Sequence, residues 1–404
     1  MSAAVKSSEP HPEVLAGLEP GPFHTRIAKL NRQHGWMNWM GFASPTVLEN
    51  EEAEYFAIRN QSTLFDISPM CKYAIEGQDA EKIVNRLVTR DIRKLKPGRV
   101  AYVIWCDEDG NVIDDGTVFR LAEDRFRLCC QDPQLAWLYD VAWGLDATIR
   151  DETREIAALA LQGPTSAALL RSLGVMEVDE LKPFAVGSIT IGAEHVTMSR
   201  TGFTGDLGYE LWMPPKSAGA VWDCLVEAGK PYGLRVIGNA ALEMARVEAG
   251  FLLPKIDFLS AHTAHRPNRP KNPFELGLEN MIAFDKPHFN GRRALMRLAG
   301  QQPRRKLFAI EIDRNKPAVN ALVYHRQRKE VGMVTSALWS PTCKRNIGFA
   351  WLDAPFGQTV QDDLWVEIYL QREIEWQRRM VRCRIVDRPF FVNERRRLTP
   401  PGNR

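Results

Sequence analysis

The pattern of secondary structure changes near residue 304, and this change limits the possible folds more than any other feature. Extended and helical segments alternate before it, whereas short β-rich runs follow it at 307–312, 330–334, 364–369 and 380–385. At about 150 residues per domain, a chain of this length contains two or three domains. We predict an α+β region of split β-α-β type, with two interleaved domains, over 22–303. A β-barrel domain is predicted over 304–404 and a flexible tail over 1–21.

A β-hairpin is predicted over residues 99–121. Two β-rich runs, 99–105 and 116–121, flank an acidic segment that contains a glycine. Asp114 and Asp115 lie next to each other before the second run. In a strand their side chains point to opposite faces, so one of them is a candidate for facing a cavity. The alternative is a solvated hairpin end with two ordinary carboxylates.

A glycine-rich bend that enters a strand is predicted over residues 200–211, where three glycines lie within seven residues. Glycine lets a backbone approach a flat ligand closely. Glu210, on the face opposite Tyr209 and Leu211, is a candidate partner for polar ring nitrogens. A β-bulge or a hairpin explains the same glycines without a ligand.

Three further groups of side chains are candidates for binding. Arg246 lies in a predicted helix that ends at a glycine, and its spacing from Glu243 also fits a surface ion pair. Trp36 and Trp39 offer indole faces for a quaternary ammonium or sulfonium group, although such a pair more often belongs to the core or to a domain contact. The basic loop 260–271 fits either carboxylate binding or a solvated surface.

Composition excludes several classes of function. Lys plus Arg is 53 and Asp plus Glu is 50, so the net charge of +3 gives no field typical of nucleic-acid binding. No apolar stretch approaches the roughly 18 residues of a membrane helix. The seven cysteines are scattered without a C-x-x-C pair, which indicates reduced thiols in the cytoplasm and no metal site.

Several segments together resemble one family. In chain order they are 64–70 (LFDISPM), 89–98 (TRDIRKLKPG), 110–115 (GNVIDD), 161–164 (LQGP), 200–210, 246–250 (RVEAG), 289–295 (FNGRRAL), 332–341 (GMVTSALWSP) and 346–350 (NIGFA). The chain is similar over nearly its whole length to the folate-dependent family of the glycine-cleavage T-protein, an aminomethyltransferase, and the tetrahydrofolate-dependent demethylases. This resemblance implies three domains around a central folate cavity, the last of them a β-barrel, and tetrahydrofolate as the cofactor.

The resemblance also implies roles for particular residues. Asp115 would lie near the reactive N5 edge of the pterin, with Asp114 as the second candidate for a catalytic role. Tyr102, Glu210 and Arg246 would bind folate. Phe203 would belong to the same site, at a position where the T-protein pattern has tyrosine.

Other departures bear on the reaction. Pro69 and Ala337 replace a histidine and a glycine of the T-protein pattern, and 272–277 (NPFELG) is more similar to the dimethylsulfoniopropionate demethylase branch. We therefore expect a methyltransferase that demethylates a small N-, S- or O-methylated substrate and transfers the methyl group to N5 of tetrahydrofolate. One alternative is a glycine-cleavage aminomethyltransferase that acts with a lipoyl carrier protein. The other is a folate-binding assembly protein without catalysis.

Overall fold

The computed structural model describes residues 17–266, 269–357, 363–398 and 400. They divide into two compact units, each built from separate stretches of the chain. The first unit is formed by the described parts of Met1–Lys72, Asp151–Glu243 and Glu394–Arg404, and the second by those of Tyr73–Arg150 and Met244–Asn393.

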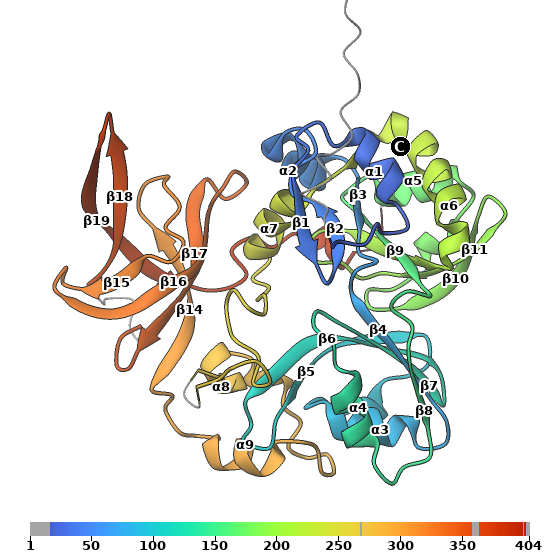
Figure 1. The fold of residues 1–404 in the computed structure, drawn as a ribbon, viewed down its shortest axis with the longest axis horizontal. Helices are drawn as coiled ribbons and strands as arrows, with labels where there is room; N and C mark the ends of the chain where they lie inside the picture. The colour runs from blue at the N-terminus through green and yellow to red at the C-terminus, as the bar shows by residue number, and fades with distance from the viewer. Residues whose placement is uncertain (1–16, 267–268, 358–362, 399, 401–404) are drawn as a thin grey trace, which may run out of the picture. The chain divides into compact units, whose positions relative to one another are not determined.

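A six-stranded sheet forms the centre of the first unit (Figure 1). Its strands, in spatial order, are β10 (Val186–Ile191), β11 (Glu194–Ser199), β12 (Gly208–Met213), β9 (Ala157–Gln162), β3 (Thr63–Asp66) and β13 (Arg235–Val236). Neighbouring strands are antiparallel except β13 and β3, which are parallel. Helices α5 (Ser166–Ser172) and α6 (Pro215–Gly229) contact the sheet. Tyr209 and Leu211 point into the core that they share, as the alternation along β12 predicts.

Shorter elements complete the first unit. They are α1 (His24–Leu30), β1 (Trp36–Trp39), β2 (Phe42–Pro45), α2 (Glu51–Asn60) and the 3-10 helices η2 (Met176–Asp179), η3 (Lys230–Tyr232) and η5 (Glu394–Arg396). Of the tail predicted over 1–21, residues 1–16 lie outside the described residues. Glu19 forms a bridge with Phe42, and its backbone bonds Gly41 and Ala43. Glu19 therefore pairs with an edge strand, while the flexibility of the tail stays a prediction.

A five-stranded sheet in the second unit has the order β5-β6-β7-β4-β8. Its strands are β4 (Cys71–Glu76), β5 (Arg99–Cys106), β6 (Val112–Ala122), β7 (Arg125–Cys130) and β8 (Thr148–Asp151). The predicted hairpin is confirmed, since β5 and β6 pair antiparallel with Ile104 opposite Asp115. Figure 1 shows α3 (Ala80–Leu87) and α4 (Leu135–Ala142) together beside this sheet, and η1 (Ile92–Lys94) follows α3.

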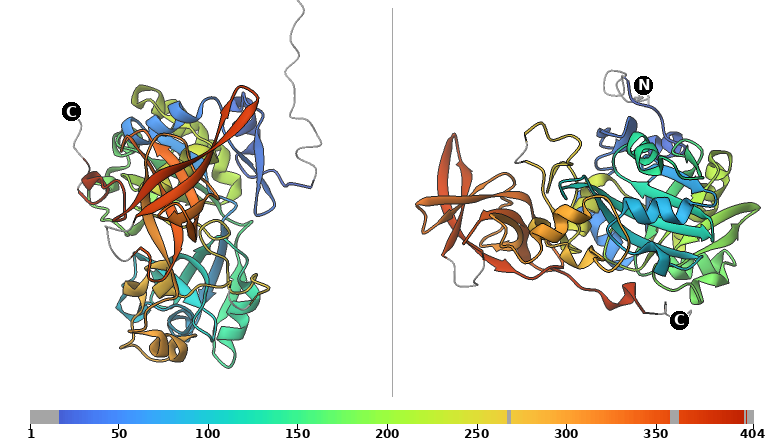
Figure 2. Two further views of the ribbon diagram at one scale, coloured as in Figure 1. Left: turned by 90° about the vertical axis from the view of Figure 1, so that its left-hand side faces the viewer. Right: turned by 90° about the horizontal axis from the view of Figure 1, so that it is seen from below.

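The C-terminal part of the second unit is a closed barrel with the order β14-β17-β16-β15-β18-β19. Its strands are β14 (Arg305–Ile312), β15 (Leu322–His325), β16 (Lys329–Ser340), β17 (Arg345–Asp353), β18 (Leu364–Arg372) and β19 (Glu375–Val386). All four predicted runs are strands of this barrel, whereas β15 and β17 were not predicted. Figure 2 shows β18 and β19 as a long twisted hairpin. The α+β fold with a C-terminal barrel is thus confirmed, while the boundary at 304 stays a prediction.

The remaining elements lie between the sheets and the barrel in the sequence. They are α7 (Asn239–Glu248), α8 (Pro273–Leu276), η4 (Glu279–Met281) and α9 (Arg292–Leu298). Asn272 and Glu275 form a capping box at the start of α8, which explains the Asn-Pro-Phe-Glu sequence locally. No helix within the described ranges has the length and apolar character that crossing a bilayer requires.

Candidate functional site

Tyr102 and Asp115 form a hydrogen-bonded pair on neighbouring strands. The register places Tyr102 opposite Thr117, so its ring and the Asp115 side chain are diagonal neighbours on one face of the sheet. The Tyr102 hydroxyl donates to Asp115 Oδ2 at 2.7 Å, and both residues are half-buried. Burial raises the pKa of Asp115 to about 6, and the bond from Tyr102 opposes that rise. The pKa of Tyr102 is raised by burial and by the Asp115 charge, so the phenol remains a donor.

Asp114 is directed away from that pair and is fully buried. Its Oδ1 accepts a bond from the backbone N–H of Asp115 at 2.8 Å, and its Oδ2 accepts one from the N–H of Asp132 at 3.1 Å. Asp132 in turn pairs with Lys255 Nζ at 2.6 Å. Burial and the neighbouring Asp115 raise the pKa of Asp114. The predicted alternation of the two acids is confirmed, and the solvated hairpin end is wrong.

Glu210 lies on β12 in the first unit, half-buried on the side of the strand away from the core. Thr201 Oγ1 donates to Glu210 Oε2 at 2.5 Å, and Ser199 shares a hydrogen bond of 2.7 Å with Thr201. Burial raises the pKa of Glu210 to about 7, and its hydroxyl partners oppose the rise. With a pKa of about 7, the protonated form of the Glu210 carboxyl group can donate a hydrogen bond and the ionised form can only accept.

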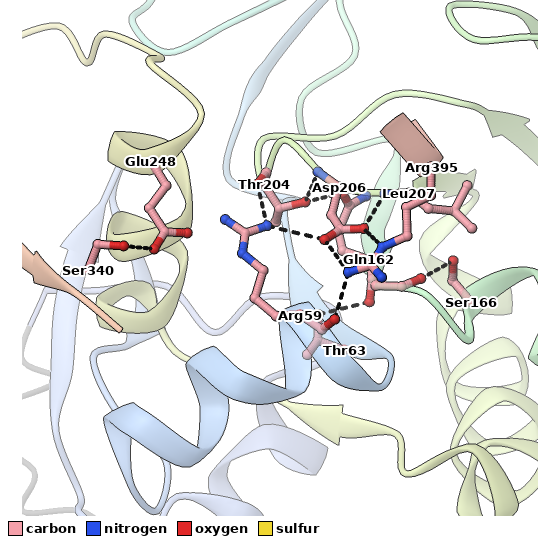
Figure 3. A network of polar contacts seen from close by, with 11 residues as sticks. Arg59, Thr63, Gln162, Ser166, Thr204, Asp206, Leu207, Glu248, Ser340 and Arg395 are labelled. Atoms are coloured by element: carbon pink, nitrogen blue, oxygen red, sulfur yellow. Dashed lines mark hydrogen bonds and ion pairs between the residues drawn. The ribbon is translucent and has the colours of Figure 1, made fainter. Parts of the chain in front are cut away.

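The loop 200–208, which holds Thr201 and Phe203, closes around the side chain of Gln162. Gln162 Nε2 donates to the carbonyl oxygens of Thr201 and Tyr209, and Thr204 Oγ1 donates to Gln162 Oε1 at 2.9 Å (Figure 3). A Cβ atom at Gly202 or Gly208 would lie within 2.3 Å of this side chain. Gly202 and Gly208 thus make room for a buried glutamine, a reason for glycine that is independent of any ligand.

Substituting Gly208 by alanine is expected to destabilise the first unit by about 1–3 kcal/mol through overpacking. The new Cβ would meet Gln162 Cδ at 2.3 Å, and Gln162 is held by its own hydrogen bonds. Denaturant unfolding would measure the loss. Gly187→Ala is the matched control, because its Cβ would meet only Leu181 Cδ1 at 3.7 Å. Equal stability of the two variants would show that Gln162 can move aside.

Arg246 is fully buried at the centre of a polar network in the second unit. Its Nη1 donates to Asp257 Oδ2 at 2.6 Å and to the Phe251 carbonyl at 3.0 Å, and its Nη2 donates to Ser336 Oγ at 2.8 Å. On the same helix Glu248 accepts a hydrogen bond from Ser340 (Figure 3). The surface position predicted for Arg246 is wrong, because the side chain is inside the protein. Its predicted contact with folate stays a prediction, and these partners give it a structural role.

The two indoles of β1 lie in different surroundings. Trp36 packs on the core of the first unit and against His24, with ring centroids 4.7 Å apart. Trp39 stacks on Phe65 at 5.7 Å. Residues three apart in a strand point to opposite faces, so a cage that uses both rings does not form here. Each indole separately remains a candidate aromatic face for a substrate cation.

Arg388 and Asp66 are among the residues with shifted pKa values that sequence reasoning did not single out. Arg388 follows the last barrel strand and donates to the carbonyls of Leu276 and Gly277. Burial lowers the pKa of Arg388, and the Tyr102 phenol opposes this. Asp66 ends β3, and burial raises its pKa to about 6. Only the Asp-x-Ser pattern could have indicated Asp66, since Ser68 N donates to its side chain as in an Asx turn.

The basic loop 260–271, of which residues 267–268 lie outside the described residues, is tied to the start of β6. Val112 N donates to the Lys271 carbonyl at 2.7 Å, and Ala261 N donates to the Val112 carbonyl at 2.9 Å. His262 packs edge-on against Trp137. Among the residues described, no cluster of three His, Cys, Asp or Glu side chains could hold a metal ion.

Two family models match the chain. The GCVT N-terminal domain matches residues 23–286, and the glycine cleavage T-protein C-terminal barrel domain matches residues 305–391. The chain therefore belongs to the glycine cleavage T-protein family. The T-protein resemblance predicted from the sequence is thus confirmed.

Individual relatives agree with this membership. An aminomethyltransferase of Thermoanaerobacter sp. (strain X514) is 32% identical over 327 residues, which are 80% of this chain and 86% of the relative. A trimethylamine-oxide aldolase of Ruegeria pomeroyi is 35% identical over 344 residues, 82% of this chain but 42% of that longer protein. The crystal structure of the T-protein from Bartonella henselae superposes with a TM-score of 0.80, covering 93% of this chain and 98% of that one. At 22% identity, this last likeness shows the T-protein fold alone.

Proposed function

We propose that this T-protein family member is a tetrahydrofolate-dependent methyltransferase that demethylates a small N-, S- or O-methylated molecule. Bound tetrahydrofolate would supply N5 as the methyl acceptor. The Tyr102–Asp115 pair carries the proposal, because it offers a half-buried carboxylate held by a phenol and a pKa of about 6. A carboxyl group with a pKa near the working pH is suited to accept a proton as a neighbouring nitrogen gains charge.

In the reaction that we propose, the protein has two tasks. It holds the methyl donor in line with N5 of tetrahydrofolate, and it supplies one proton acceptor. The bond from the methyl carbon to its donor atom breaks, the donor atom keeps the electron pair, and the methyl group bonds to N5. The proton of N5 passes to the Asp115 carboxylate. Alignment of the reactants can lower the activation free energy by roughly 7–11 kcal/mol. A sulfonium or quaternary ammonium donor leaves as a neutral molecule, so it requires no general acid.

Other residues receive supporting roles in this proposal. Asp114 positions Asp115, since both of its oxygens accept backbone N–H groups. Glu210 and Phe203 are proposed to bind folate, with Glu210 as the hydrogen-bonding partner of its polar ring atoms. The titratable Glu210 carboxyl, whose pKa is about 7, fits a partner that presents both donors and acceptors.

The relatives support two classes of substrate. The relative named for trimethylamine oxide, a molecule with methyl groups on nitrogen, is 35% identical, compared with 32% for the aminomethyltransferase. This favours an N-methylated donor. The second candidate is aminomethyl transfer from a lipoyl carrier protein. The relative named aminomethyltransferase favours it, because the match spans 86% of that relative, compared with 42% of the relative named for trimethylamine oxide.

Product analysis separates these candidates. Purified protein is incubated without oxygen with tetrahydrofolate and trimethylamine oxide, betaines, methylamines, sulfonium compounds or methoxyarenes, and folate species are resolved by chromatography. Formation of 5-methyltetrahydrofolate with one donor supports the proposal and identifies the leaving atom. Methylenetetrahydrofolate formed only with an aminomethylated lipoyl carrier supports the second candidate. Folate binding without either product contradicts both and leaves the non-catalytic alternative.

The pH dependence of kcat/KM should report the Asp115 carboxylate. Protonated Asp115 cannot accept a proton, so kcat/KM is expected to fall as the pH is lowered through the pKa of about 6 and to level off above it. The Glu210→Gln variant should show the same fall of kcat/KM at low pH, because the substitution leaves Asp115 in place and removes only the carboxyl group whose pKa is about 7. A wild-type profile that is flat between pH 5 and pH 8 would contradict the assignment.

A further inference from the structure

The segment 394–400, described except for residue 399, is named here the C-terminal strap, and it contacts the glycine-rich loop of the first unit. Arg395 Nε donates to Asp206 Oδ1 at 2.6 Å, and Arg395 Nη2 donates to Asp206 Oδ2 at 3.0 Å (Figure 3). The same Nη2 donates to the carbonyl of Arg59 at 2.7 Å. Two parallel N–H bonds to one carboxylate fix both partners more strictly than a point charge does.

A second contact lies at the other end of the loop. Arg200 Nη2 donates to the carbonyl oxygen of Leu398, and Arg171 Nη2 lies 3.4 Å from the carbonyl oxygen of Pro400. Arg200 begins the loop 200–208, and Asp206 lies near its end. The strap therefore contacts the loop on both sides of Phe203.

The position of Asp206 makes this contact important for the loop. Its side chain is 0% exposed, and Arg59, which is also buried, is its other cation partner at 3.4 Å. Arg59 Nη1 further donates to the carbonyl of Thr204. Two guanidinium groups thus hold one loop carboxylate, one from α2 and one from the strap. Both family models end before the strap, at residues 286 and 391.

We propose that Arg395 is a positioning residue that fixes the loop 200–208 in the conformation that binds folate. The loop supplies Phe203, and its Thr201 donates a hydrogen bond to Glu210 on β12. Movement of the loop would therefore displace Phe203 and remove a hydrogen bond that orients the Glu210 carboxyl group. The inference rests on the proposed function for its ligand, but the ordering of the loop is a property of the free protein. The C-terminal end of the chain would thereby control affinity for the cofactor without touching it.

Arg395→Met tests this in the full-length chain. The Arg395 side chain is 35% exposed and Asp206 retains Arg59, so the variant is expected to fold. Amide hydrogen exchange of residues 200–208 should accelerate about tenfold in the ligand-free variant, because the loop opens locally. The Kd and KM for tetrahydrofolate should rise about tenfold, with kcat within about twofold of wild type. Arg397→Met, which removes an exposed charge from the same turn, is the matched control.

Each outcome decides one question. Wild-type exchange and affinity in Arg395→Met would overturn the proposal, and so would faster loop exchange with unchanged folate affinity. Arg395→Lys should recover part of the affinity, since it restores the charge without the paired bonds. A melting temperature that falls while loop exchange and KM stay at wild-type values would show a merely structural role and also overturn it. Failure of the wild-type protein to bind tetrahydrofolate would refute the proposed function, while exchange would still decide whether the strap orders the loop.

Discussion

Asp115→Asn is expected to reduce kcat by about 10²–10⁴-fold while tetrahydrofolate still binds, because the amide cannot accept the N5 proton. Asparagine retains a carbonyl oxygen, so the Tyr102 hydroxyl, which donates to Asp115 Oδ2 at 2.7 Å, keeps an acceptor. The substitution therefore removes a charge and a proton-accepting group with little change of shape. Single-turnover formation of methylated folate measures the chemical step separately from product release.

Asp109→Asn is the control for this experiment, since it removes an exposed carboxylate from the same hairpin. The control should retain wild-type turnover. An Asp115→Asn protein with full turnover would assign proton acceptance to another group or to solvent. A protein that no longer binds tetrahydrofolate would instead give Asp115 a role in binding.

The stability of Asp115→Asn supplies an independent check. Burial raises the pKa of Asp115 from 3.8 to about 6, so the folded state retains a proton that the unfolded chain releases between these pH values. The contribution of Asp115 to the free energy of unfolding therefore decreases as the pH rises through this range. Asparagine does not titrate. The variant is expected to be at least as stable as wild type at pH 8, and a large loss of stability would mean that the carboxylate is needed for folding.

Local patterns predicted the fold well where the relevant partners are close in the sequence. The alternation of Tyr209, Glu210 and Leu211 correctly separated the core face of β12 from the other face. The β5–β6 hairpin and four barrel strands were also predicted from short β-rich runs. The missed strands β15 and β17 pair with neighbours in the barrel, and their register depends on contacts that no short window contains.

The candidate site was harder to predict, because its side chains bond partners far along the chain. Asp114 is bonded by the N–H of Asp132, which no spacing rule connects with it. The glycines at 202 and 208 surround Gln162, a residue about 40 positions earlier. Helical spacing suggested a surface pair of Arg246 with Glu243, but it indicated neither the burial of Arg246 nor its bond to Asp257, which follows the helix. Periodicity predicts which face a residue occupies but does not identify its distant partner.

Arg246→Met is expected to lower the free energy of unfolding by about 3–5 kcal/mol, because it leaves the Asp257 carboxylate buried without its cation. Asp257 Oδ2 accepts a hydrogen bond from Arg246 at 2.6 Å, and the exposed fraction of each side chain is at most 1%. Denaturant unfolding followed by fluorescence would measure the loss. Arg26→Met is the matched control, since the Arg26–Asp223 pair is exposed and should contribute less than about 1 kcal/mol.

A second substitution shows whether the loss of stability comes from the unpaired charge of Asp257 or from the missing Arg246 side chain itself. Asp257→Asn combined with Arg246→Met removes the buried charge but keeps an acceptor for Thr335 and Ser336, which donate to Asp257 Oδ1 at 2.7 Å. The double variant should therefore be more stable than Arg246→Met alone. If Arg246→Met instead kept wild-type stability and lost only tetrahydrofolate binding, the buried network would not be its main role. The folate contact implied by the family resemblance would then be correct.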